Sequence, residues 1–420
     1  MAAKRKSNRL IRVGVIGVLR GMGFARGAPF VGMKLVALCD TWEAKLREAG
    51  AQLGVATYTD FDAFLEHDMD AVILANYFHE HAPFAIKALE RGLHAMSETM
   101  ACKTPAEGVA LARAVEKSGK IYMFAENYPF FACNQEMRRL YRAGEVGEMQ
   151  YGEGEYNHPI DSWEANRLAP GMQHWRNWIP STYYCSHALA PLMYITDTRP
   201  LRVNALSVAR FAGDKETRNV RRGDPGSVIL CRMDNESVVR LMGINLRGHG
   251  TWCRIHGTRG LMENLRTGDR SMVRVCHDPW DLKKGDVEEK IYQPQFPIHA
   301  ELAKKTGHGG GDFFTNYYFA EAIRANEQPY LDVYRGLDMA MVSIQSWRSA
   351  LADGVPFEIP DFRKEAARRK YAKDDWSPWP EDARPGQPPP SIKGTNKPRP
   401  AAVAYARKVW KEIGYDGKWD

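Results

Sequence analysis

The stretch Arg12-Val13-Gly14-Val15-Ile16-Gly17-Val18-Leu19-Arg20-Gly21-Met22-Gly23 joins a short β-branched strand to a glycine-rich turn. A helical segment with small residues follows, and the apolar run at residues 34–39 is a second strand that ends on Asp40. A strand, a glycine turn, a helix, a second strand and an acid about twenty residues on form the arrangement that binds dinucleotides. In that arrangement the glycines let the backbone approach a pyrophosphate, the helix N-terminus favours its charge, and the acid binds the ribose hydroxyls.

The turn departs from the usual fingerprint. A strict G-x-G-x-x-G from Gly17 needs glycine at two positions where the chain has Leu19 and Met22, so an ordinary glycine-rich βα loop is the alternative. Asp40 favours the dinucleotide site, and Thr41-Trp42 after it include no arginine to receive a 2′-phosphate, which predicts NAD rather than NADP. The cofactor-binding residues expected here are Gly17, Leu19, Arg20, Gly21 and Asp40.

Strands and helices alternate as far as residue 125. Helices are expected over residues 42–53, 60–65, 83–91 and 105–118, and strands over residues 70–75, 94–97 and 121–125. This spacing predicts a doubly wound parallel sheet, a Rossmann domain over residues 1–126.

The hydrophobic period changes after residue 126. A helix is expected over residues 133–143, and two long helices over residues 313–326 and 333–352. Between them, strand-like segments occur at hairpin spacing, at residues 148–157, 201–210, 227–233, 237–244, 251–256 and 271–276. They predict a second α/β domain over residues 127–361 with an open, mainly antiparallel sheet.

Residues 362–420 have a different composition. Prolines at residues 376–380 and 385–390 interrupt regular structure, yet the segment keeps Tyr405, Val409, Trp410, Tyr415 and Trp419. Aromatic side chains at that density usually pack, so we expect an arm on the protein itself or on a neighbouring subunit, with disorder as the alternative. From residue 363 onward, 14 basic and 8 acidic side chains account for most of the net charge of +7. Prolines and acids interrupt this basic segment and no recognition motif accompanies it, so no nucleic-acid partner is expected.

Composition limits the class of protein further. No apolar run approaches the roughly 20 residues of a membrane helix, and the basic N-terminus leads into the first strand instead of a signal-peptide core. The seven cysteines include no C-x-x-C pair, which is typical of reduced thiols and argues against a structural zinc. We therefore expect a cytoplasmic protein with no membrane partner and no bound metal.

The strand expected at residues 94–97 ends on Glu98-Thr99-Met100. From about residue 12 to residue 362 the chain resembles the Gfo/Idh/MocA oxidoreductases, in which a Rossmann domain precedes an α/β domain with an open sheet. Typical dehydrogenases of that family carry Glu-Lys-Pro here, and the lysine assists proton transfer at the substrate alcohol. This chain has Thr99 in place of the lysine.

Further motifs are similar to one branch of that family that also lacks the lysine, the NAD-dependent glycosidases of glycoside hydrolase family 109. In chain order they are Leu19-Arg20-Gly21-Met22-Gly23, Phe78 to His81, Glu98-Thr99, Asn127, Glu155-Tyr156-Asn157-His158, Tyr184-Cys185-Ser186-His187, Gly307 to Phe313 and Pro356 to Phe362. The resemblance implies that the NAD site also includes Asn76, Phe78, His81, Glu98, Thr99 and Asn127. The turn is one residue shorter than in the branch and Cys185 departs from its pattern, so the exact substrate stays open.

The resemblance implies an NAD-dependent glycoside hydrolase that oxidises the sugar transiently at C3, eliminates the leaving group, adds water and re-reduces the product. A net NAD-dependent sugar or polyol dehydrogenase is the alternative, and a cofactor-bound protein without catalytic activity is a third. The missing lysine at position 99 favours the hydrolase over the dehydrogenase. The family also implies a carbohydrate substrate and a homo-oligomer, a dimer or tetramer that forms through the open sheet.

Oxidation of a sugar alcohol needs a base for the hydroxyl proton, and histidine or tyrosine serves when its surroundings tune it. The resemblance makes His187 the expected base, at a helix start that favours an uncharged imidazole, with Tyr184 and Tyr156 as further catalytic candidates. Arg176, Tyr156, Tyr184 and His308 are the candidates for substrate binding. The alternatives are structural roles for the tyrosines, a surface cation–π contact for Arg176, and ordering of the glycine loop by His308.

Overall fold

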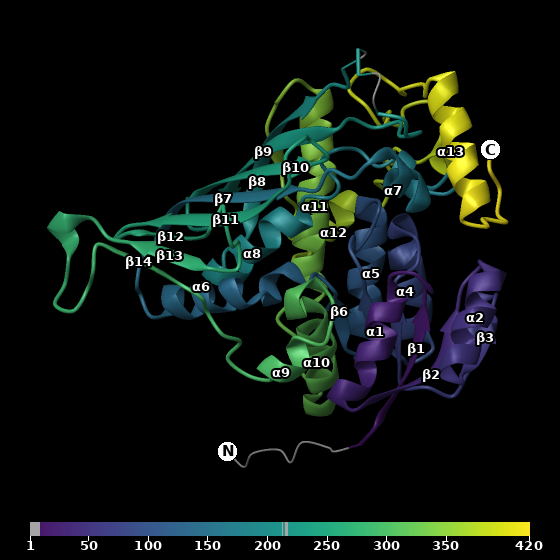
Figure 1. Ribbon diagram of the computed structural model, residues 1–420, viewed down its shortest axis with the longest axis horizontal. Helices are drawn as coiled ribbons and strands as arrows, with labels where there is room; N and C mark the ends of the chain where they lie inside the picture. Colours follow the sequence, from purple (N-terminus) through teal and green to yellow (C-terminus); the bar gives the residue numbers. More distant parts are fainter. Residues whose placement is uncertain (1–8, 212, 215–216) are drawn as a thin grey trace.

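The first sheet of the protein is parallel throughout. The computed structural model describes residues 9–211, 213–214 and 217–420. The strand order is β3-β2-β1-β4-β5-β6, and every neighbouring pair is parallel. Its strands are β1 (Ile11–Ile16), β2 (Met33–Cys39), β3 (Ala56–Tyr58), β4 (Ala71–Leu74), β5 (His94–Ser97) and β6 (Tyr122–Phe124). The helices between them, seen around the sheet in Figure 1, are α1 (Gly21–Gly27), α2 (Glu43–Leu53), α3 (Phe61–Leu65), α4 (His81–Glu90) and α5 (Pro105–Ser118).

This sheet confirms the predicted doubly wound arrangement. The strand order reverses between β1 and β4, and at such a point the carboxyl ends of the strands leave a crevice for ligands. The residues that follow the strands at this edge are Gly17, Asp40, Ala75, Asn76, Glu98, Ala125 and Glu126. Four of the predicted cofactor residues, Gly17, Asp40, Asn76 and Glu98, therefore belong to the edge where the fold places a ligand.

The second sheet is mainly antiparallel, as predicted. Its order is β14-β13-β12-β11-β7-β10-β9-β8-β15, and the pair β7 and β10 is parallel. The strands are β7 (Met149–Asn157), β8 (Pro200–Val208), β9 (Gly226–Met233), β10 (Val238–Ile244), β11 (Gly250–Gly257), β12 (Leu261–Asn264), β13 (Val273–Cys276), β14 (Glu289–Tyr292) and β15 (Phe357–Glu358). No strand was predicted at β3, β12, β14 or β15, because these strands of two to four residues are too short for a period of two and lack the continuous apolar run of β4.

Helices cover one face of the second sheet and join it to the first. Helices α6 (Ala132–Arg142) and α8 (Ser186–Thr196) pack together, and α8 lies on β7. The approach is close because a Cβ at Gly154 of β7 would lie 2.1 Å from the carbonyl oxygen of Ala188. Helix α10 (Gly311–Ala325) packs against α1, and α11 (Val333–Leu351) packs against both α5 and β8. In the described ranges, none of the helices has the length and apolar composition of a membrane span.

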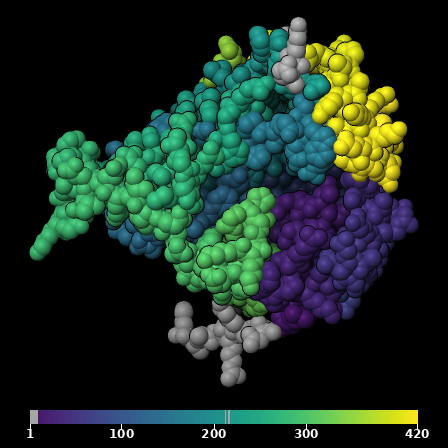
Figure 2. Space-filling view, in the orientation of Figure 1, coloured from purple at the N-terminus to yellow at the C-terminus, as the bar shows by residue number. Residues whose placement is uncertain are grey.

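The C-terminal arm, residues 362–420, lies on the chain's own body. It contains α12 (Glu365–Tyr371) and α13 (Pro400–Glu412), and Figure 2 shows it, in yellow, where the purple N-terminal part meets the blue-green second part. Trp379 is 1% exposed, and its ring stacks on Phe78 and Tyr183 at centroid distances of 6.3 and 5.4 Å. The arm thus packs against the aromatic side chains behind the crevice.

Polar contacts and a second aromatic group hold the arm along its length. Its Asp382 pairs with Lys103 at 2.7 Å, and its Trp410 donates a hydrogen bond to the carbonyl oxygen of Asn166 at 3.0 Å. Near the C-terminus, Tyr415 packs edge-on against the ring of Trp42, two residues after Asp40, at a centroid distance of 5.7 Å. The arm therefore touches both the Rossmann part and the second part of the chain.

Replacing Trp379 with alanine is expected to lower the free energy of unfolding by about 3 kcal/mol, because a large buried ring leaves a cavity that its neighbours fill incompletely. Chemical denaturation of both proteins measures the difference. Trp280 is 84% exposed, so Trp280→Ala is the matched control and should leave the midpoint nearly unchanged. Equal effects of the two substitutions would contradict the structural role of the arm.

Candidate active site

The glycine turn after β1 lies against the end of β4. Gly17 has a φ of 98°, and a Cβ there would lie 2.2 Å from the carbonyl oxygen of Ala75, so a side chain would displace the turn. The carboxylate of Asp40 accepts hydrogen bonds from the backbone N–H groups of Val18 and Trp42, each at 2.7 Å. The acid at the end of β2 therefore holds the turn beside the crevice.

A buried carboxylate, Asp312 on α10, ties this turn to the second part of the chain. The guanidinium of Arg20 donates to both oxygens of Asp312, at 2.8 and 2.9 Å, and to Glu98 at 2.6 Å. Asn127 Nδ2 donates to Asp312 at 2.9 Å, and His308 Nδ1 lies 2.9 Å from it. Burial alone would raise the pKa of Asp312, but the hydrogen bonds from His308 and Arg20 and the charge of Arg20 lower this pKa well below its usual range.

Several buried polar atoms in the segments that follow β2, β4 and β6 have no partner among the described residues. They include Trp42 Nε1, Asn76 Oδ1, His81 Nε2 and Asn127 Oδ1. Burial lowers the pKa of His81 to about 4, so the imidazole is neutral at pH 7. Its Nδ1 lies 3.0 Å from the carbonyl oxygen of Met100, which can only accept, so Nε2 is an acceptor. Since buried polar groups are normally paired, this set of donors and acceptors fits the ribose and carboxamide groups of a dinucleotide.

The remaining predicted cofactor residues differ in their surroundings. Leu19 is 52% exposed, whereas Phe78 and Thr99 are buried. Gly21 begins α1, and the N–H of Thr99 donates to the Glu98 side chain at 3.1 Å. A threonine hydroxyl, and no amine, therefore occupies the end of β5 where the dehydrogenases place their lysine.

Glu126 and His187 form a hydrogen-bonded pair. Nδ1 of His187 lies 2.6 and 2.8 Å from the two carboxylate oxygens of Glu126, whose side chain is fully buried. Glu126 follows β6, and His187 is the second residue of α8. Because a carboxylate accepts the hydrogen bond, Nδ1 carries the proton and Nε2 is available to accept another. The pair has the arrangement of a general base and the group that orients it.

Three tyrosines surround the imidazole of His187. The ring of Tyr128 stacks on it at a centroid distance of 4.4 Å, and Tyr156 and Tyr184 meet it edge-on at 4.6 and 5.0 Å. Burial and the hydroxyls of Tyr184 and Tyr128 raise the pKa of Tyr156 well above its usual value. The Tyr156 hydroxyl therefore stays protonated at neutral pH, which favours a hydrogen-bond donor over a base.

The rings of Tyr184, Phe78 and Trp175 form an aromatic wall that leads from the tyrosines to Arg176. The ring of Phe78 stacks on Tyr184 at 5.7 Å and on Trp175 at 4.8 Å, measured between centroids. The Arg176 guanidinium carbon lies 4.3 Å from the Trp175 centroid and 6.0 Å from the Tyr184 centroid. Its charge also opposes the rise in the pKa of Tyr156. A cation and several ring faces thus lie beside the histidine pair.

The predicted catalytic and substrate-binding residues fall into two groups in the structure. His187, Tyr184, Tyr156 and Arg176 lie together, whereas His308 belongs to the group around Asp312. Glu126, Tyr128 and Asp312 were not among the residues predicted from the sequence. The signal for Glu126 was its place directly after a parallel strand, where ligands bind, and Asp312 stood in the same glycine-rich motif as His308.

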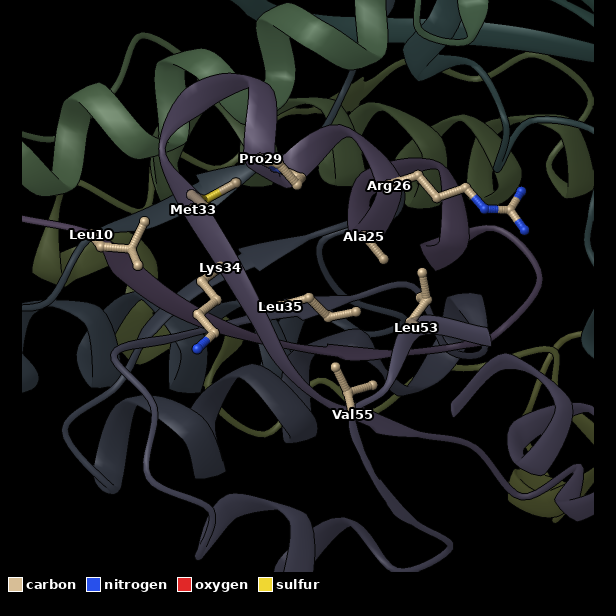
Figure 3. Close-up of a pocket in the computed structure, with 9 residues that line it drawn as sticks. All are labelled: Leu10, Ala25, Arg26, Pro29, Met33, Lys34, Leu35, Leu53 and Val55. Carbon is tan, nitrogen blue, oxygen red and sulfur yellow. The ribbon is translucent and has the colours of Figure 1, made fainter. Parts of the chain in front are cut away.

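A separate hollow of about 530 Å³ lies away from these groups, on the first part of the chain. Figure 3 shows that it is lined mainly by apolar side chains, among them Leu35, Leu53 and Val55. No predicted site residue lines it. Among the described residues, no group of three or more His, Cys, Asp or Glu side chains is placed to hold a metal ion.

Two family models match the chain in the order of its sheets. Residues 11–126 match the oxidoreductase family with an NAD-binding Rossmann fold. Residues 135–369, more than half of the chain, match the C-terminal domain of glycosyl hydrolase 109. The chain belongs to the glycosyl hydrolase 109 family. It is therefore an NAD-dependent enzyme, and the predicted resemblance is confirmed.

Proteins of this family and of the wider fold resemble the chain over most of its length. A glycosyl hydrolase family 109 protein of Shewanella sp. (strain ANA-3) is 26% identical and covers 85% of this chain and 86% of its own. A Shewanella oneidensis protein named alpha-N-acetylgalactosaminidase is 25% identical with the same coverage. The structure of a levoglucosan dehydrogenase in complex with NADH and L-sorbose superimposes with a TM-score of 0.71 at 18% identity, over 84% of this chain and 100% of that one. The last likeness shows the shared fold.

Proposed function

We propose that this glycosidase hydrolyses N-acetyl-α-galactosaminides by transient oxidation of the sugar at C3, elimination, addition of water and re-reduction. The observation that carries the proposal is the Glu126–His187 pair next to a dinucleotide crevice. The sugar is suggested by the name of the Shewanella oneidensis relative. Conventional glycosidases use two carboxylates that flank the scissile bond, whereas the proposed mechanism needs no such pair.

His187 and its neighbours supply the proton transfers. Nε2 of His187 accepts the proton of the sugar hydroxyl, and Glu126 stabilises the resulting imidazolium. Bound NAD supplies the hydride acceptor for the oxidation and the donor for the re-reduction. A ketone at C3 acidifies the proton on C2, so a base can remove it while the C1 substituent leaves.

The aromatic wall and Arg176 bind and orient the sugar in this proposal. Tyr156, which stays protonated, donates a hydrogen bond to a sugar oxygen, and Tyr184 contributes a second hydroxyl. Arg176 binds a sugar oxygen from the far end of the wall, where the Trp175 ring lies under its guanidinium. Held between these groups, the sugar is positioned for the chemistry of its C1, C2 and C3 atoms.

A screen of aryl glycosides without added cofactor tests the proposal. Purified enzyme should release the phenol from the aryl N-acetyl-α-galactosaminide with no steady accumulation of NADH, because the redox change cancels within each turnover. Stoichiometric NADH from free sugars, with added NAD, would instead support a net dehydrogenase. Bound NAD with neither reaction on a broad panel would support a binding protein. Thr99, in place of the lysine of the dehydrogenases, disfavours the net dehydrogenase.

We expect the enzyme to bind NAD at least tenfold more tightly than NADP, because a 2′-phosphate would place its charge next to the Asp40 carboxylate. Titration of cofactor-free protein with each dinucleotide measures the preference. Asp40→Asn should reduce it, mainly by weakening NAD binding. Asp68→Asn, an exposed carboxylate before β4, is the control and should keep it. Equal affinity of the unaltered protein for both dinucleotides would contradict the role of Asp40.

The proposal extends to the organisation of the protein. The chain comprises a cofactor-binding unit over residues 1–126, a substrate and oligomerisation unit over residues 127–361 and the arm over residues 362–420. We propose a cytoplasmic homo-oligomer, a dimer or tetramer, with a carbohydrate substrate and no nucleic-acid or membrane partner. Light scattering of the full chain, and of a chain ending at Phe362, tests whether the arm contributes to assembly. An unchanged number of subunits would restrict the arm to covering its own subunit.

A further inference from the structure

A cavity of about 460 Å³ lies next to the histidine pair. His187 and Tyr128 form part of its wall, whereas Tyr156, Tyr184 and Arg176 do not line it. The rest of the wall comes from α8 and the start of α6, from β7, β11 and β12, and from loop residues at 270–271, 293–296 and 304–309. Its volume is within the range of sites for small ligands, about 300–1,000 Å³.

The position of this cavity relates it to the reaction. The sugar is proposed to lie among Tyr156, Tyr184 and Arg176, on one side of His187, and the cavity borders the same imidazole and its stacked partner Tyr128. A substrate whose sugar contacts His187 can therefore extend into the cavity with the group attached to the sugar. None of the substrate-binding residues assigned above serves that second group.

The charged groups around the cavity are mainly cationic. Arg270 and Lys304 line it, and Glu155 is the acidic residue of the lining. A second acid, Asp269, lies beside the lining, where its exposed carboxylate accepts hydrogen bonds from the N–H and the hydroxyl of Ser271. Glu155 is 7% exposed and pairs with Arg266 at 2.8 Å, so its charge is neutralised. Lys304 pairs with Glu301 in an exposed contact, which solvent weakens.

The partner of Arg270 is uncharged. Its guanidinium donates to the Nδ1 atom of His249 at 2.6 Å and to the His249 carbonyl oxygen at 2.8 Å. Arg270 can only donate, so Nδ1 is the acceptor of a neutral imidazole. Burial, His158 and the charge of Arg270 all lower the pKa of His249, in agreement with the neutral form. The positive charge of Arg270 is held in place without being cancelled.

Aromatic and amide groups complete the lining. Phe131 and Phe296 offer apolar ring surface, and Gln293, Gln295 and Ser271 offer exposed polar atoms near the two cations. Such a mixture of ring faces and a few polar groups suits a planar or sugar-sized group that carries an anionic substituent.

We infer that this cavity is the leaving-group subsite and that it takes an aglycone bearing a carboxylate. The inference rests on the proposed glycosidase function. Arg270 and Lys304 bind the carboxylate, the ring faces hold the body of the leaving group, and His187 is shared by the two halves of the substrate. The preference for a charged leaving group is thus set by residues outside the aromatic wall that binds the sugar.

Three aryl N-acetyl-α-galactosaminides test the subsite: phenyl, 4-carbamoylphenyl and 4-carboxyphenyl. The carbamoyl group has the shape of the carboxylate without its charge and withdraws electrons at least as strongly, so intrinsic reactivity does not favour the carboxylate. The kcat/KM for the 4-carboxyphenyl glycoside should exceed that for the 4-carbamoylphenyl glycoside on the order of tenfold, the effect of one charge-assisted hydrogen bond. The ratio should fall as salt is added.

Variants assign this preference to the two cations. Arg270→Gln and Lys304→Gln should each reduce the ratio toward one, and a general loss of activity cancels because both glycosides are measured on the same variant. Lys305→Gln is the matched control, since Lys305 is the exposed neighbour of Lys304 and does not line the cavity. It should keep the ratio of the unaltered enzyme.

A binding measurement separates failure of the subsite from failure of the function. Calorimetry of the NAD-loaded His187→Ala variant with the two substituted glycosides gives the preference without turnover. A tenfold preference in binding for the 4-carboxyphenyl glycoside that Arg270→Gln removes would support the subsite. Failure of the unaltered enzyme to cleave either glycoside would overturn the proposed function and leave the subsite standing. Equal affinities and equal kcat/KM values for the two glycosides would overturn the subsite.

Discussion

Replacing His187 with alanine is expected to lower kcat on the order of 100-fold or more, while NAD binding and the fold are retained. In the proposed mechanism Nε2 of this residue accepts the proton, and Nδ1 lies 2.6 Å from the Glu126 carboxylate. Alanine is a good helix former, so α8 keeps its structure. Steady-state kinetics on the glycoside found by the screen, NAD titration and circular dichroism measure the three quantities.

Glu126→Gln tests the partner in the same assay. An amide keeps the size of the side chain but loses the charge that stabilises the imidazolium, so kcat should fall while KM changes little, and the pH profile of kcat should shift. Glu263→Gln is the control for a buried glutamate: Glu263 is 4% exposed, and its carboxylate binds Arg254, Arg274 and Trp252 instead of the histidine. Near-full activity of His187→Ala would refute its role as base and direct attention to Tyr184, which Tyr184→Phe tests.

Asp312→Asn is expected to lower the free energy of unfolding by about 3 kcal/mol and to weaken NAD binding. The substitution leaves the Arg20 guanidinium with Glu98 as its remaining carboxylate partner. Removing one member of a buried ion pair typically costs about 3–5 kcal/mol. It also loosens Asn127 and the glycine turn, which contact the cofactor crevice. Urea denaturation and NAD titration measure the two effects.

The stabilisation by Asp312 depends on pH. The pKa of its carboxyl group is lowered in the folded protein, so the native state holds the ionised form more tightly than the unfolded chain does. Its contribution is fully present above the unfolded pKa of about 4 and is lost as the pH falls through the lower, folded value. Asp312→Asn should therefore destabilise the protein most at neutral pH and progressively less in acid.

Asp62→Asn is the matched control for this prediction. Asp62 pairs with Lys87 at 2.8 Å, and the two side chains are 60% and 50% exposed. An exposed pair of this kind contributes about 0–1 kcal/mol. Equal losses of stability in Asp312→Asn and Asp62→Asn at neutral pH would show that Asp312 does not act as a buried link between the two parts of the chain.

Local patterns in the chain were sufficient to predict the order of elements in the first 126 residues, with the exception of the three-residue strand β3. The β-branched run at residues 12–16, the glycine turn and Asp40 are close in sequence and carry their geometry with them, because turn and strand preferences act over a few residues. The same holds for the long strands of the second sheet and for α10 and α11. Short strands such as β14 and β15 form because neighbouring strands pair with them, and their own residues hold little periodic signal.

The composition of the catalytic group depends on contacts between residues far apart in the chain. Glu126 meets His187 across 61 positions, and Arg20 meets Asp312 across 292. Motifs in the chain identified His187 and the residues around Asp312, but no local pattern indicates which carboxylate faces which cation. That pairing follows from the packing of α8 on β7 and of α10 on α1, since buried charges are stable only where the fold places an opposite charge within hydrogen-bonding distance.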